Sequence, residues 1–343
     1  MAWTVPEHTR QEVNEAGRTY VGGTASPEDR ELALAVIDNW RSSHSYPLNT
    51  FQMSLRRQAA EIDAEPTVAQ RIKRLPSIRH KLERFSTMNL SQMQDLGGAR
   101  AVVTGAEEVE RLSRYYLDTS RIKHKLVKQN DYIAEPKKSG YRGVHLVYGY
   151  NSDRNSDWNA LKIELQLRSQ LQHAWATAVE TVGTFTQQAL KSSWGDEDML
   201  RFFILMSSAH ARRENRPLAP GTPTKAKELA AEIRRYAKKL RVVERLQAYG
   251  ATLQLAERNA HLKAHAFLLE LDTSDENSLL IRYYENDVAA ADAYSAVERA
   301  IEGEPTKDAV LVRADSLVAL RRAYPNYFLD TTAFVQSVEE AVR

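Results

Sequence analysis

The most informative stretch for the fold of this chain is Asp95-Leu96-Gly97-Gly98-Ala99-Arg100. It continues into the apolar Ala101-Val102-Val103 and predicts a short strand with a carboxylate at its start. A second stretch, Lys162-Ile163-Glu164-Leu165-Gln166-Leu167-Arg168, alternates polar and apolar residues with the two-residue period of a strand. Neighbouring strands can hold Asp95 and Glu164 close together, and a hard cation such as Mg2+ relieves the repulsion between two ionised carboxylates. We therefore expect a shared metal site. The alternative is that Glu164 is a solvated strand residue.

A glycine-hinged loop separates the two stretches, with the sequence Pro136-Lys137-Lys138-Ser139-Gly140-Tyr141-Arg142-Gly143-Val144-His145. Gly140 allows a positive φ or a close approach of the backbone to a ligand. Tyr141 would then stand free at the start of a strand and could stack on a base. Phosphate contacts would come from Lys137, Lys138 and Arg142. The alternative is a β-turn with one exposed tyrosine. We expect His145 to be a hydrogen-bonded histidine in or near the sheet and not a metal ligand, because no second histidine stands at ligand spacing.

A basic segment precedes these stretches. Residues 68–86 have a helical pattern in which Arg71, Arg74 and Lys81 are spaced by three and seven residues, and Ser77 follows Arg74 at another three-residue step. Three cations and a hydroxyl on one helical face suit a triphosphate, and a solvated basic face is the alternative. A second basic run is typical of a solvated strand edge but could also contact RNA phosphates. It consists of Arg121, Lys123, Lys125 and Lys128.

The bulk composition excludes several classes of site. The chain has 343 residues and a net charge of +2, so any anion site must come from local clustering of cations. It contains no cysteine, which excludes disulfides and thiolate-bound zinc or iron–sulfur clusters. The first residues lack the basic-then-apolar pattern of a signal peptide, and no run reaches the roughly 18 apolar residues of a membrane span. We expect a cytoplasmic protein with no membrane partner.

The order of predicted elements indicates an α/β (α+β) protein with a mixed sheet flanked by helices. Ser26-Pro27-Glu28-Asp29 has the serine cap, first-turn proline and acids of a helix start. Residues 44–49 should end that helix. The next expected elements are helices over about 49–64, 106–117 and 170–182 and strands near 100–104, 144–150 and 161–167.

Two features lie beyond a proline-rich linker at 214–223. Residues 229–243 carry apolar side chains at the 4-3-4-3 spacing of a coiled-coil seam, which predicts either a homo-oligomer contact or a helix packed on its own domain. The tail after residue 265 alternates again. It is expected to hold strands near 266–271, 278–284 and 309–313, a helix near 287–301 and a short helix closed by Tyr324-Pro325.

Taken together, the motifs resemble the synthetase domain of the RelA/SpoT family of alarmone synthetases, over roughly residues 60–185. The resemblance is specific because several separate blocks occur in the family's order. The matching blocks are Arg71-Ile72-Lys73-Arg74-Leu75-Pro76-Ser77-Ile78-Arg79-His80-Lys81-Leu82, Met93-Gln94-Asp95-Leu96-Gly97-Gly98-Ala99-Arg100, Asp131-Tyr132-Ile133, Pro136-Lys137, Ser139-Gly140-Tyr141-Arg142 with His145, Ile163-Glu164-Leu165-Gln166-Leu167-Arg168, and Trp175 with Glu180.

The resemblance implies a nucleotidyltransferase-like fold and a pyrophosphokinase. Such an enzyme transfers the β,γ-pyrophosphate of ATP to the 3′-hydroxyl of GDP or GTP, making (p)ppGpp and releasing AMP. By the same resemblance Arg71 and Arg100 would sandwich the adenine, and Lys73, Ser77 and Lys81 would hold the ATP phosphates.

The remaining roles implied by the resemblance concern the metal and the acceptor. Asp95 and Glu164 would bind Mg2+, and Glu164 would also help to deprotonate the attacking hydroxyl. Tyr141 would stack on the acceptor's guanine. Two further pairs would serve the acceptor side: Lys137 and His145 near the acceptor or the transferring phosphates, and Gln166 and Glu180 shaping the acceptor pocket.

Departures from the family pattern are mild within these blocks: Gly143 and Ser169 replace a common serine and threonine. The first sixty residues are too short for the family's hydrolase domain, so the resemblance implies a small, single-activity synthetase, a kind that is often homo-oligomeric. We expect a helical N-terminal segment (1–65), the synthetase domain (66–212), a linker and long helix (213–264) and a small C-terminal α/β accessory module (265–343).

Two alternatives to the alarmone synthetase stay open. A toxin-like relative would transfer pyrophosphate to the 3′-CCA end of tRNA or to an adenine nucleotide, with residues 265–343 as a neutralising or sensing domain and residues 121–128 as a seat for tRNA. A nucleotide-binding regulator without catalysis is the third possibility, although retention of the acidic and basic motif residues argues against it.

Overall fold

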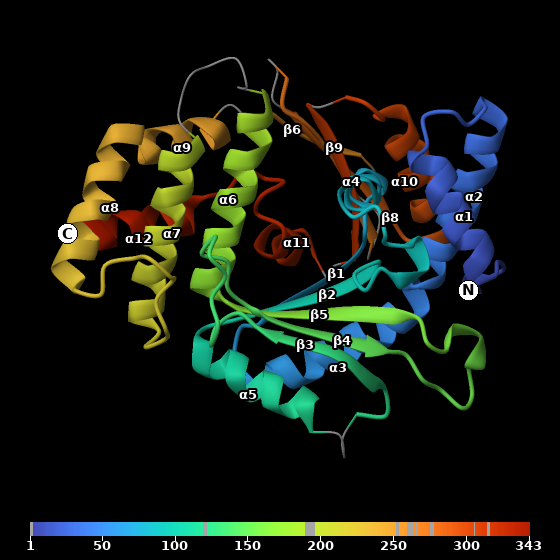
Figure 1. Cartoon of the computed structure of the whole chain (residues 1–343), viewed down its shortest axis with the longest axis horizontal. Coiled ribbons are helices and arrows are strands. Elements are labelled where there is room, and N and C mark those ends of the chain that lie inside the picture. Colours follow the sequence, from blue (N-terminus) through green and yellow to red (C-terminus); the bar gives the residue numbers. More distant parts are fainter. Residues whose placement is uncertain are drawn as a thin grey trace.

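A mixed sheet, in which the described residues form nine strands, runs through the molecule (Figure 1). The computed structural model describes residues 3–118, 122–188, 196–251, 254–258, 264, 266–274, 278–304, 306–313 and 316–343. The strand order is β3-β4-β5-β2-β1-β9-β7-β8-β6. The strands are β1 (Thr67–Ile72), β2 (Gly97–Val103), β3 (Lys125–Asp131), β4 (Val144–Gly149), β5 (Lys162–Ser169), β6 (Gln254–Arg258), β7 (Ala266–Asp272), β8 (Ser278–Tyr284) and β9 (Lys307–Arg313). The β2–β5 and β6–β8 pairs are parallel and the others are antiparallel, which confirms the predicted mixed α/β fold.

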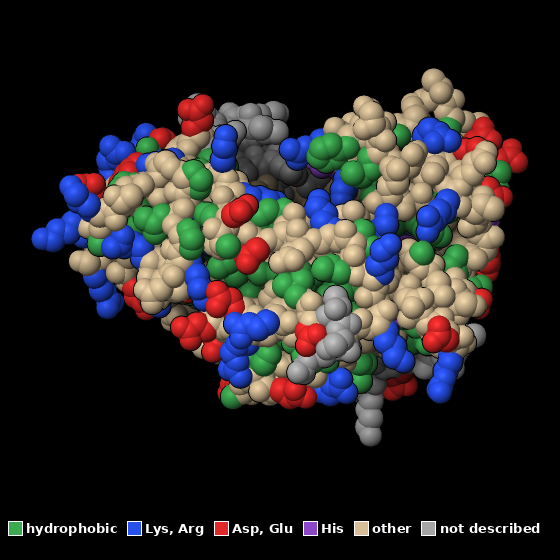
Figure 2. All heavy atoms as spheres, turned by 60° about the horizontal axis from the view of Figure 1, so that its bottom comes forward, with side chains coloured by type: hydrophobic (Ala, Val, Ile, Leu, Met, Phe, Trp, Pro, Cys, Tyr) green, Lys and Arg blue, Asp and Glu red, His purple; other side chains and the backbone are tan. Residues whose placement is uncertain are grey.

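Helices flank both faces of this sheet. They are α1 (Arg10–Val21), α2 (Pro27–Ser43), α3 (Ser45–Ile62), α4 (Leu75–Arg84), α5 (Ala106–Leu117), α6 (Gln170–Gln188), α7 (Asp196–Arg213), α8 (Ala226–Leu240), α9 (Val242–Ala251), α10 (Asp287–Ala300), α11 (Leu317–Ala323) and α12 (Thr332–Val342). In Figure 1, α3 and α5 lie below the β3–β1 half of the sheet and α6 rises on the opposite side. None of the helices in the described ranges is long and apolar enough to cross a membrane. Lysine, arginine and acidic side chains are interspersed over the face that Figure 2 shows.

The two faces of β5 explain this layering. Ile163, Leu165 and Leu167 are fully buried and belong to the core under α3 and α5, as the two-residue period of a strand requires. Glu164 and Gln166 therefore point to the other face, toward α6. The sheet thus separates an apolar side from a polar side.

The N-terminal helices begin and end close to where the sequence indicates. The Ser26 hydroxyl accepts the Asp29 backbone N–H at 3.0 Å and Pro27 occupies the first turn of α2, which confirms the predicted helix start. The break after α2 is shorter than predicted: α3 begins at Ser45, not near residue 49. The His44 side chain is buried and hydrogen-bonds the Trp40 carbonyl at 2.7 Å, so the chain turns between the two helices without a loop.

The C-terminal strands continue the same sheet. The strands and helices expected between 266 and 323 are present, and β9 pairs with β1 through Gln70↔Arg313 and Arg71↔Val312. This pairing joins residues that are more than 240 positions apart and places the C-terminal segment beside the basic segment. It is the feature of the fold that bears most directly on the site described below.

The apolar stripe at 229–243 is used within the chain. Leu229, Ile233 and Leu240 of α8 are buried in a helical core that also contains residues of α6, α7 and α12. Of the two predicted uses of this stripe, packing on its own chain is therefore the one observed.

Arg41 joins three parts of the chain in the interior. Its Nε donates to the Lys73 carbonyl at 3.0 Å, and its Nη2 donates to Glu298 Oε2 at 2.8 Å. The other carboxylate oxygen of Glu298 accepts the backbone N–H of Leu75, the first residue of α4, at 2.7 Å. The Arg41 and Glu298 side chains are 3% and 1% exposed. This ion pair is shielded from water and ties α2, α4 and α10 together.

Replacing Glu298 by glutamine is expected to lower the free energy of unfolding by about 3 kcal/mol, because the buried Arg41 cation loses its fully buried partner and keeps only Asp38, whose side chain is 16% exposed. Urea denaturation measures the change. The matched control is Glu304→Gln, an exposed acid just after α10, which should alter the free energy of unfolding by no more than about 0.5 kcal/mol. Equal stability of the two variants would contradict the role given to this ion pair.

Candidate active site

The basic segment is not one helix. Residues 67–72 form β1, which pairs with β2 from Thr67↔Val102 to Ile72↔Gly97, and only Leu75–Arg84 is helical. The prediction of a helix over 68–86 was therefore wrong in its first half, because pairing in the sheet outweighs a helical charge spacing. Pro76 in the first turn of α4 marks the actual helix start. Arg71 and Arg74 precede the helix, so the single cationic face predicted for them with Lys81 does not exist.

Two lysines hold Asp95 just before β2. Lys73 Nζ donates to Asp95 Oδ2 and Lys81 Nζ donates to Asp95 Oδ1, each at 2.9 Å. Burial alone would raise the pKa of Asp95, but the two ammonium groups outweigh burial and hold that pKa below its ordinary value. Asp95 is therefore ionised at neutral pH, with two cations beside it that could turn to phosphate oxygens.

Glu164 of β5 is held by its neighbours on the polar face of the sheet. Its Oε1 lies 2.8 Å from Nδ1 of His145, and its Oε2 accepts Nε2 of Gln166 at 2.7 Å. Burial raises the pKa of Glu164, but the hydrogen bonds from His145 and Gln166 lower it more, so the pKa lies below its ordinary value. Asp95 acts in the opposite direction and raises it, so the two carboxylates interact electrostatically.

A chain of hydrogen bonds extends from Glu164 to Tyr141. The Tyr141 hydroxyl lies 2.5 Å from Nε2 of His145 and accepts Nη2 of Arg168 at 2.9 Å. Arginine can only donate, so the tyrosine oxygen accepts from Arg168 and its hydrogen is available to Nε2 of His145, while Nδ1–H of His145 donates to the Glu164 carboxylate.

The loop that carries Tyr141 is anchored on α7. Gly140 has φ +87°, and a Cβ on it would lie 3.1 Å from Cβ of Ser207 and 3.2 Å from Cα of Ile204, so both conformation and space require glycine. The Ser207 hydroxyl donates to the Gly140 carbonyl at 2.6 Å and accepts Nε of the buried Arg142 at 2.9 Å. These contacts fix the Tyr141 ring just before the start of β4. No sequence pattern had pointed to α7 as its support.

Arg168 was not among the predicted site residues, although it ends the motif of β5. It is 4% exposed, and its Nε and Nη1 have no hydrogen-bond partner within the described residues. Arg100 lies near it, and its buried Nε also lacks a partner there. Burial and then the charge of Arg168 lower the pKa of Arg100 to about 10. Unpaired N–H groups of two neighbouring cations make this end of the site suited to an anion.

The C-terminal segment reaches the two arginines predicted to sandwich adenine. The Arg100 guanidinium lies 5.7 Å from the centre of the Tyr324 ring, and its Nη1 donates to the Ala323 carbonyl at 3.5 Å. Tyr324 and Tyr327 are both close enough to Arg71 to raise its pKa, against the opposing effect of burial. The two tyrosines are 3% and 1% exposed.

Arg74 is held by the same segment. It forms an ion pair with Asp308 of β9, and its Nη1 donates to the Tyr327 hydroxyl at 3.0 Å. The Tyr327 hydroxyl in turn donates to Asp308 at 3.1 Å. A cation next to the phosphate-binding candidates is thus neutralised by a residue more than 230 positions away.

The structure brings most of the predicted site residues to one side of the sheet, in two groups. Lys73, Lys81 and Asp95 form the first group; Tyr141, His145, Glu164 and Gln166 form the second.

The other predicted residues lie around these groups. Lys137 Nζ lies 5.1 Å from the Tyr141 ring centre and 4.1 Å from that of Tyr132. Glu180 is exposed on α6, and its charge raises the pKa values of Arg71 and Arg100. It therefore lies close to the two arginines predicted to sandwich the adenine. Ser77 is half-buried in the first turn of α4. Arg121 of the second basic run lies outside the described residues.

The acidic residues suit a magnesium ion that takes most of its ligands from phosphates and water. The described residues contain no group of three or more His, Asp or Glu side chains placed to hold a metal by themselves. Two interacting carboxylates, Asp95 and Glu164, match the preference of Mg2+ for one or two carboxylates plus phosphate oxygens. The site therefore fits a metal that arrives with a nucleotide.

Comparison with known proteins supports the resemblance drawn from the motifs. Residues 70–187 match the family model described as "Region found in RelA / SpoT proteins". A curated relative, GTP pyrophosphokinase YjbM of Bacillus subtilis (strain 168), is 33% identical over 112 residues, which are 32% of this chain and 52% of the relative. The chain thus spans about half the length of this relative.

Solved structures of similar proteins include small alarmone synthetase 1 from Bacillus subtilis. Bound to its product pppGpp, it is 26% identical to this chain, covers 50% of this chain and 87% of its own, and has a TM-score of 0.41. Another structure of the same synthetase is 23% identical, covers 55% and 92% of the two chains, and has a TM-score of 0.42. The sequence match over 70–187 confirms the predicted resemblance to the RelA/SpoT synthetase region.

Proposed function

We propose that this chain is an ATP-dependent nucleotide 3′-pyrophosphokinase that transfers the β,γ-pyrophosphate of ATP to the 3′-hydroxyl of GDP or GTP. The observation that carries the proposal is the pairing of two clusters on one face of the sheet. Asp95 is flanked by Lys73 and Lys81, and Glu164 is oriented by His145 and Gln166. Both clusters lie within the segment that matches the RelA/SpoT region.

The proposed reaction needs little covalent work by the protein. The acceptor's 3′-oxygen attacks the β-phosphorus of ATP, the bond from that phosphorus to the α,β-bridging oxygen breaks, and AMP leaves with the electron pair. Glu164 takes the proton of the 3′-hydroxyl, and its lowered pKa keeps it ionised for this role. Lys73 and Lys81 neutralise charge on the transferring phosphates. Mg2+ held by Asp95 and Glu164 supplies Lewis-acid charge stabilisation when bound.

The unpaired donors at Arg100 and Arg168 support an anionic substrate at this end of the site. Buried N–H groups without partners are costly, and phosphate oxygens satisfy them with charge-assisted hydrogen bonds. The position predicted for the adenine, between Arg71 and Arg100, is next to these donors. We place the enzyme in the cytoplasm, where ATP and guanine nucleotides are available as substrates.

Tyr141→Ala is expected to raise the KM for the acceptor about tenfold to a hundredfold, with ATP binding nearly unchanged, because stacking on a base contributes about 1–3 kcal/mol. Steady-state kinetics with varied GDP, together with equilibrium binding of a non-hydrolysable ATP analogue, separate the two effects. Tyr141→Phe is the matched control, since it keeps the ring and loses only the hydroxyl that His145 and Arg168 contact. Weakened ATP binding with an unchanged acceptor KM would show that the loop has been misassigned.

The contacts of Tyr324 and Tyr327 favour a second candidate, a toxin-like relative whose C-terminal segment neutralises it. In that case the acceptor is the 3′-CCA end of tRNA or an adenine nucleotide, and the transfer chemistry is the same. We propose that Tyr324 covers Arg100 while Tyr327 and Asp308 hold Arg74, so that the described arrangement excludes ATP. The C-terminal segment would then have to move away before the chain could act.

A further inference from the structure

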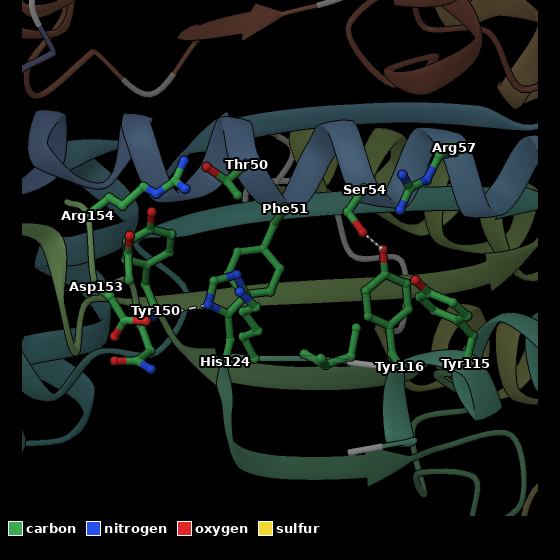
Figure 3. Close-up of a pocket in the computed structure, with 14 residues that line it drawn as sticks. Thr50, Phe51, Ser54, Arg57, Tyr115, Tyr116, His124, Tyr150, Asp153 and Arg154 are labelled. Atoms are coloured by element: carbon green, nitrogen blue, oxygen red, sulfur yellow. Dashed lines mark hydrogen bonds between the residues drawn. The ribbon is translucent and has the colours of Figure 1, made fainter. Parts of the chain in front are cut away.

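We propose that a pocket on the opposite face of the sheet is a second ligand site, for a small phosphorylated ligand with an aromatic or apolar portion such as a nucleoside phosphate. The pocket is a hollow of about 710 Å3 between α3, the end of α5, the start of β3 and the loop that follows β4. Figure 3 shows it from the side, with α3 running along its upper edge. This inference does not depend on the proposed function.

The pocket is separate from the candidate active site. Its α3 residues Thr50, Phe51, Ser54 and Arg57 belong to the helix that packs on the apolar face of β1 and β2. Glu164 points to the other face of the sheet, since the intervening Ile163 and Leu165 are buried in the core under α3 and α5. A ligand in the pocket therefore does not compete for the catalytic groups.

The inner wall of the pocket is aromatic and fixed. The His124 ring lies between Phe51, at 4.5 Å between ring centres, and Tyr150, at 4.9 Å and an interplanar angle of 27°. Phe51, Tyr116 and Tyr150 are only 2%, 2% and 5% exposed. Rings that pack on one another in this way form a preformed apolar wall, which is typical of small-molecule sites.

Two polar groups of the lining, His124 and Ser54, each keep a hydrogen that they can donate. His124 Nδ1 accepts the Asn151 backbone N–H at 3.1 Å, so its Nε2 carries the ring hydrogen. Burial lowers the pKa of His124, which keeps the ring neutral. The Ser54 oxygen accepts the Tyr116 hydroxyl at 3.2 Å, which leaves the Ser54 hydrogen free to donate.

The lining of the pocket contains three cationic side chains and one acidic side chain. The cations are Arg57, Lys123 and Arg154, and the acid is Asp153. Within the described ranges, none of the three cations has an ion pair. In Figure 3, Arg57 and Arg154 lie at opposite ends of the pocket, with Phe51 and His124 between them. Cations at both ends of an aromatic wall suit a ligand that carries phosphate and a flat apolar part.

The size and surroundings favour a small ligand over a polyanion. A hollow of this size falls within the range of about 300–1,000 Å3 that small-molecule sites occupy. The lower face of Figure 1, brought forward in Figure 2, carries Lys and Arg interspersed with Asp and Glu and not one continuous basic track. A nucleic-acid backbone needs such a track, because phosphate contacts dominate its affinity. We therefore commit to a nucleoside phosphate.

Equilibrium titration of the full chain with GDP, ADP and inorganic pyrophosphate tests the proposal. We expect one class of nucleotide sites to lose at least about tenfold in affinity in Arg57→Ala and in Arg154→Ala, since each removes a charge-assisted contact to phosphate. The same class should persist in Lys73→Ala, which weakens the candidate active site instead. Arg57 and Arg154 are exposed, so both variants should fold. Arg235→Ala, on the exposed side of α8, is the control for loss of one positive charge.

Two results would overturn the proposal. Both pocket variants could bind every probe with the affinity of the unaltered chain. Alternatively, the pocket variants could lose affinity for a single-stranded RNA oligonucleotide while nucleotide binding stayed unchanged, which would make this face an RNA contact.

Discussion

Replacing Glu164 by glutamine is expected to reduce pyrophosphate transfer about a thousandfold or more and to leave ATP binding largely intact. Glutamine keeps the shape of the side chain but cannot take the proton of the attacking hydroxyl, and general-base catalysis alone contributes roughly 10²–10⁴-fold. The change also removes one of the two carboxylates available to Mg2+. Rapid-quench measurement of AMP and labelled product gives the rate of the chemical step.

The matched control for this substitution is Glu135→Gln, which alters an exposed acid in the loop before Tyr141. It should transfer pyrophosphate at nearly the rate of the unaltered chain. His145→Asn would report on the neighbour that orients Glu164 and should fall between the two. Normal turnover by Glu164→Gln would remove this residue from the catalytic assignment.

Replacing Tyr324 by alanine is expected to raise the affinity for ATP about tenfold to a hundredfold. The ring that lies over Arg100 is lost, and with it a cation–π contact of roughly 0.5–2 kcal/mol and the apolar cover over the predicted adenine position. A gain of a hundredfold would mean that the covered arrangement makes up about 99% of molecules before the change. Binding of a fluorescent ATP analogue measures the effect directly.

Tyr324 is buried, so its removal could loosen the C-terminal segment as a whole. Asp308→Asn is therefore the second variant, because it breaks the ion pair with Arg74 at a side chain that is 35% exposed. It should raise ATP affinity in the same direction but by less. Val318→Ala, at an exposed position of α11, is the control and should change nothing. Unchanged or weaker ATP binding in both Tyr324→Ala and Asp308→Asn would contradict a neutralising role for this segment.

The parts of the site that could be predicted from the sequence are those carried by local patterns. Asp95 lies just before a strand-like run and Glu164 within one, and β2 and β5 do pair, with Gly98 opposite Glu164. Gly140 could be predicted as a hinge because only glycine takes its positive φ without strain. These features depend on residues close together in the chain.

The parts that could not be predicted depend on contacts between distant residues. A helical charge spacing around Arg71 was misleading, because the pairing of β1 with β2 and β9 determines its conformation. Ser207 supports Gly140 from a helix that no motif marked. Tyr324 was predicted only to close a short helix, and Tyr327 was not singled out. The joining of β9 to β1 brings these tyrosines to Arg100 and Arg74.

Transfer from γ-labelled ATP with Mg2+, with GDP, GTP, ATP and bulk tRNA offered as acceptors in parallel, tests the central claim most directly. The γ label travels with the transferred pyrophosphate, so the labelled product names the acceptor. The account predicts label on GDP or GTP. An increase in label when Tyr324 is replaced by alanine would support a neutralising C-terminal segment, whichever acceptor is labelled. Label on tRNA alone would select the toxin-like relative over the alarmone synthetase. Absence of label on every acceptor, from both the unaltered chain and Tyr324→Ala, would contradict the assignment of this chain as a pyrophosphokinase.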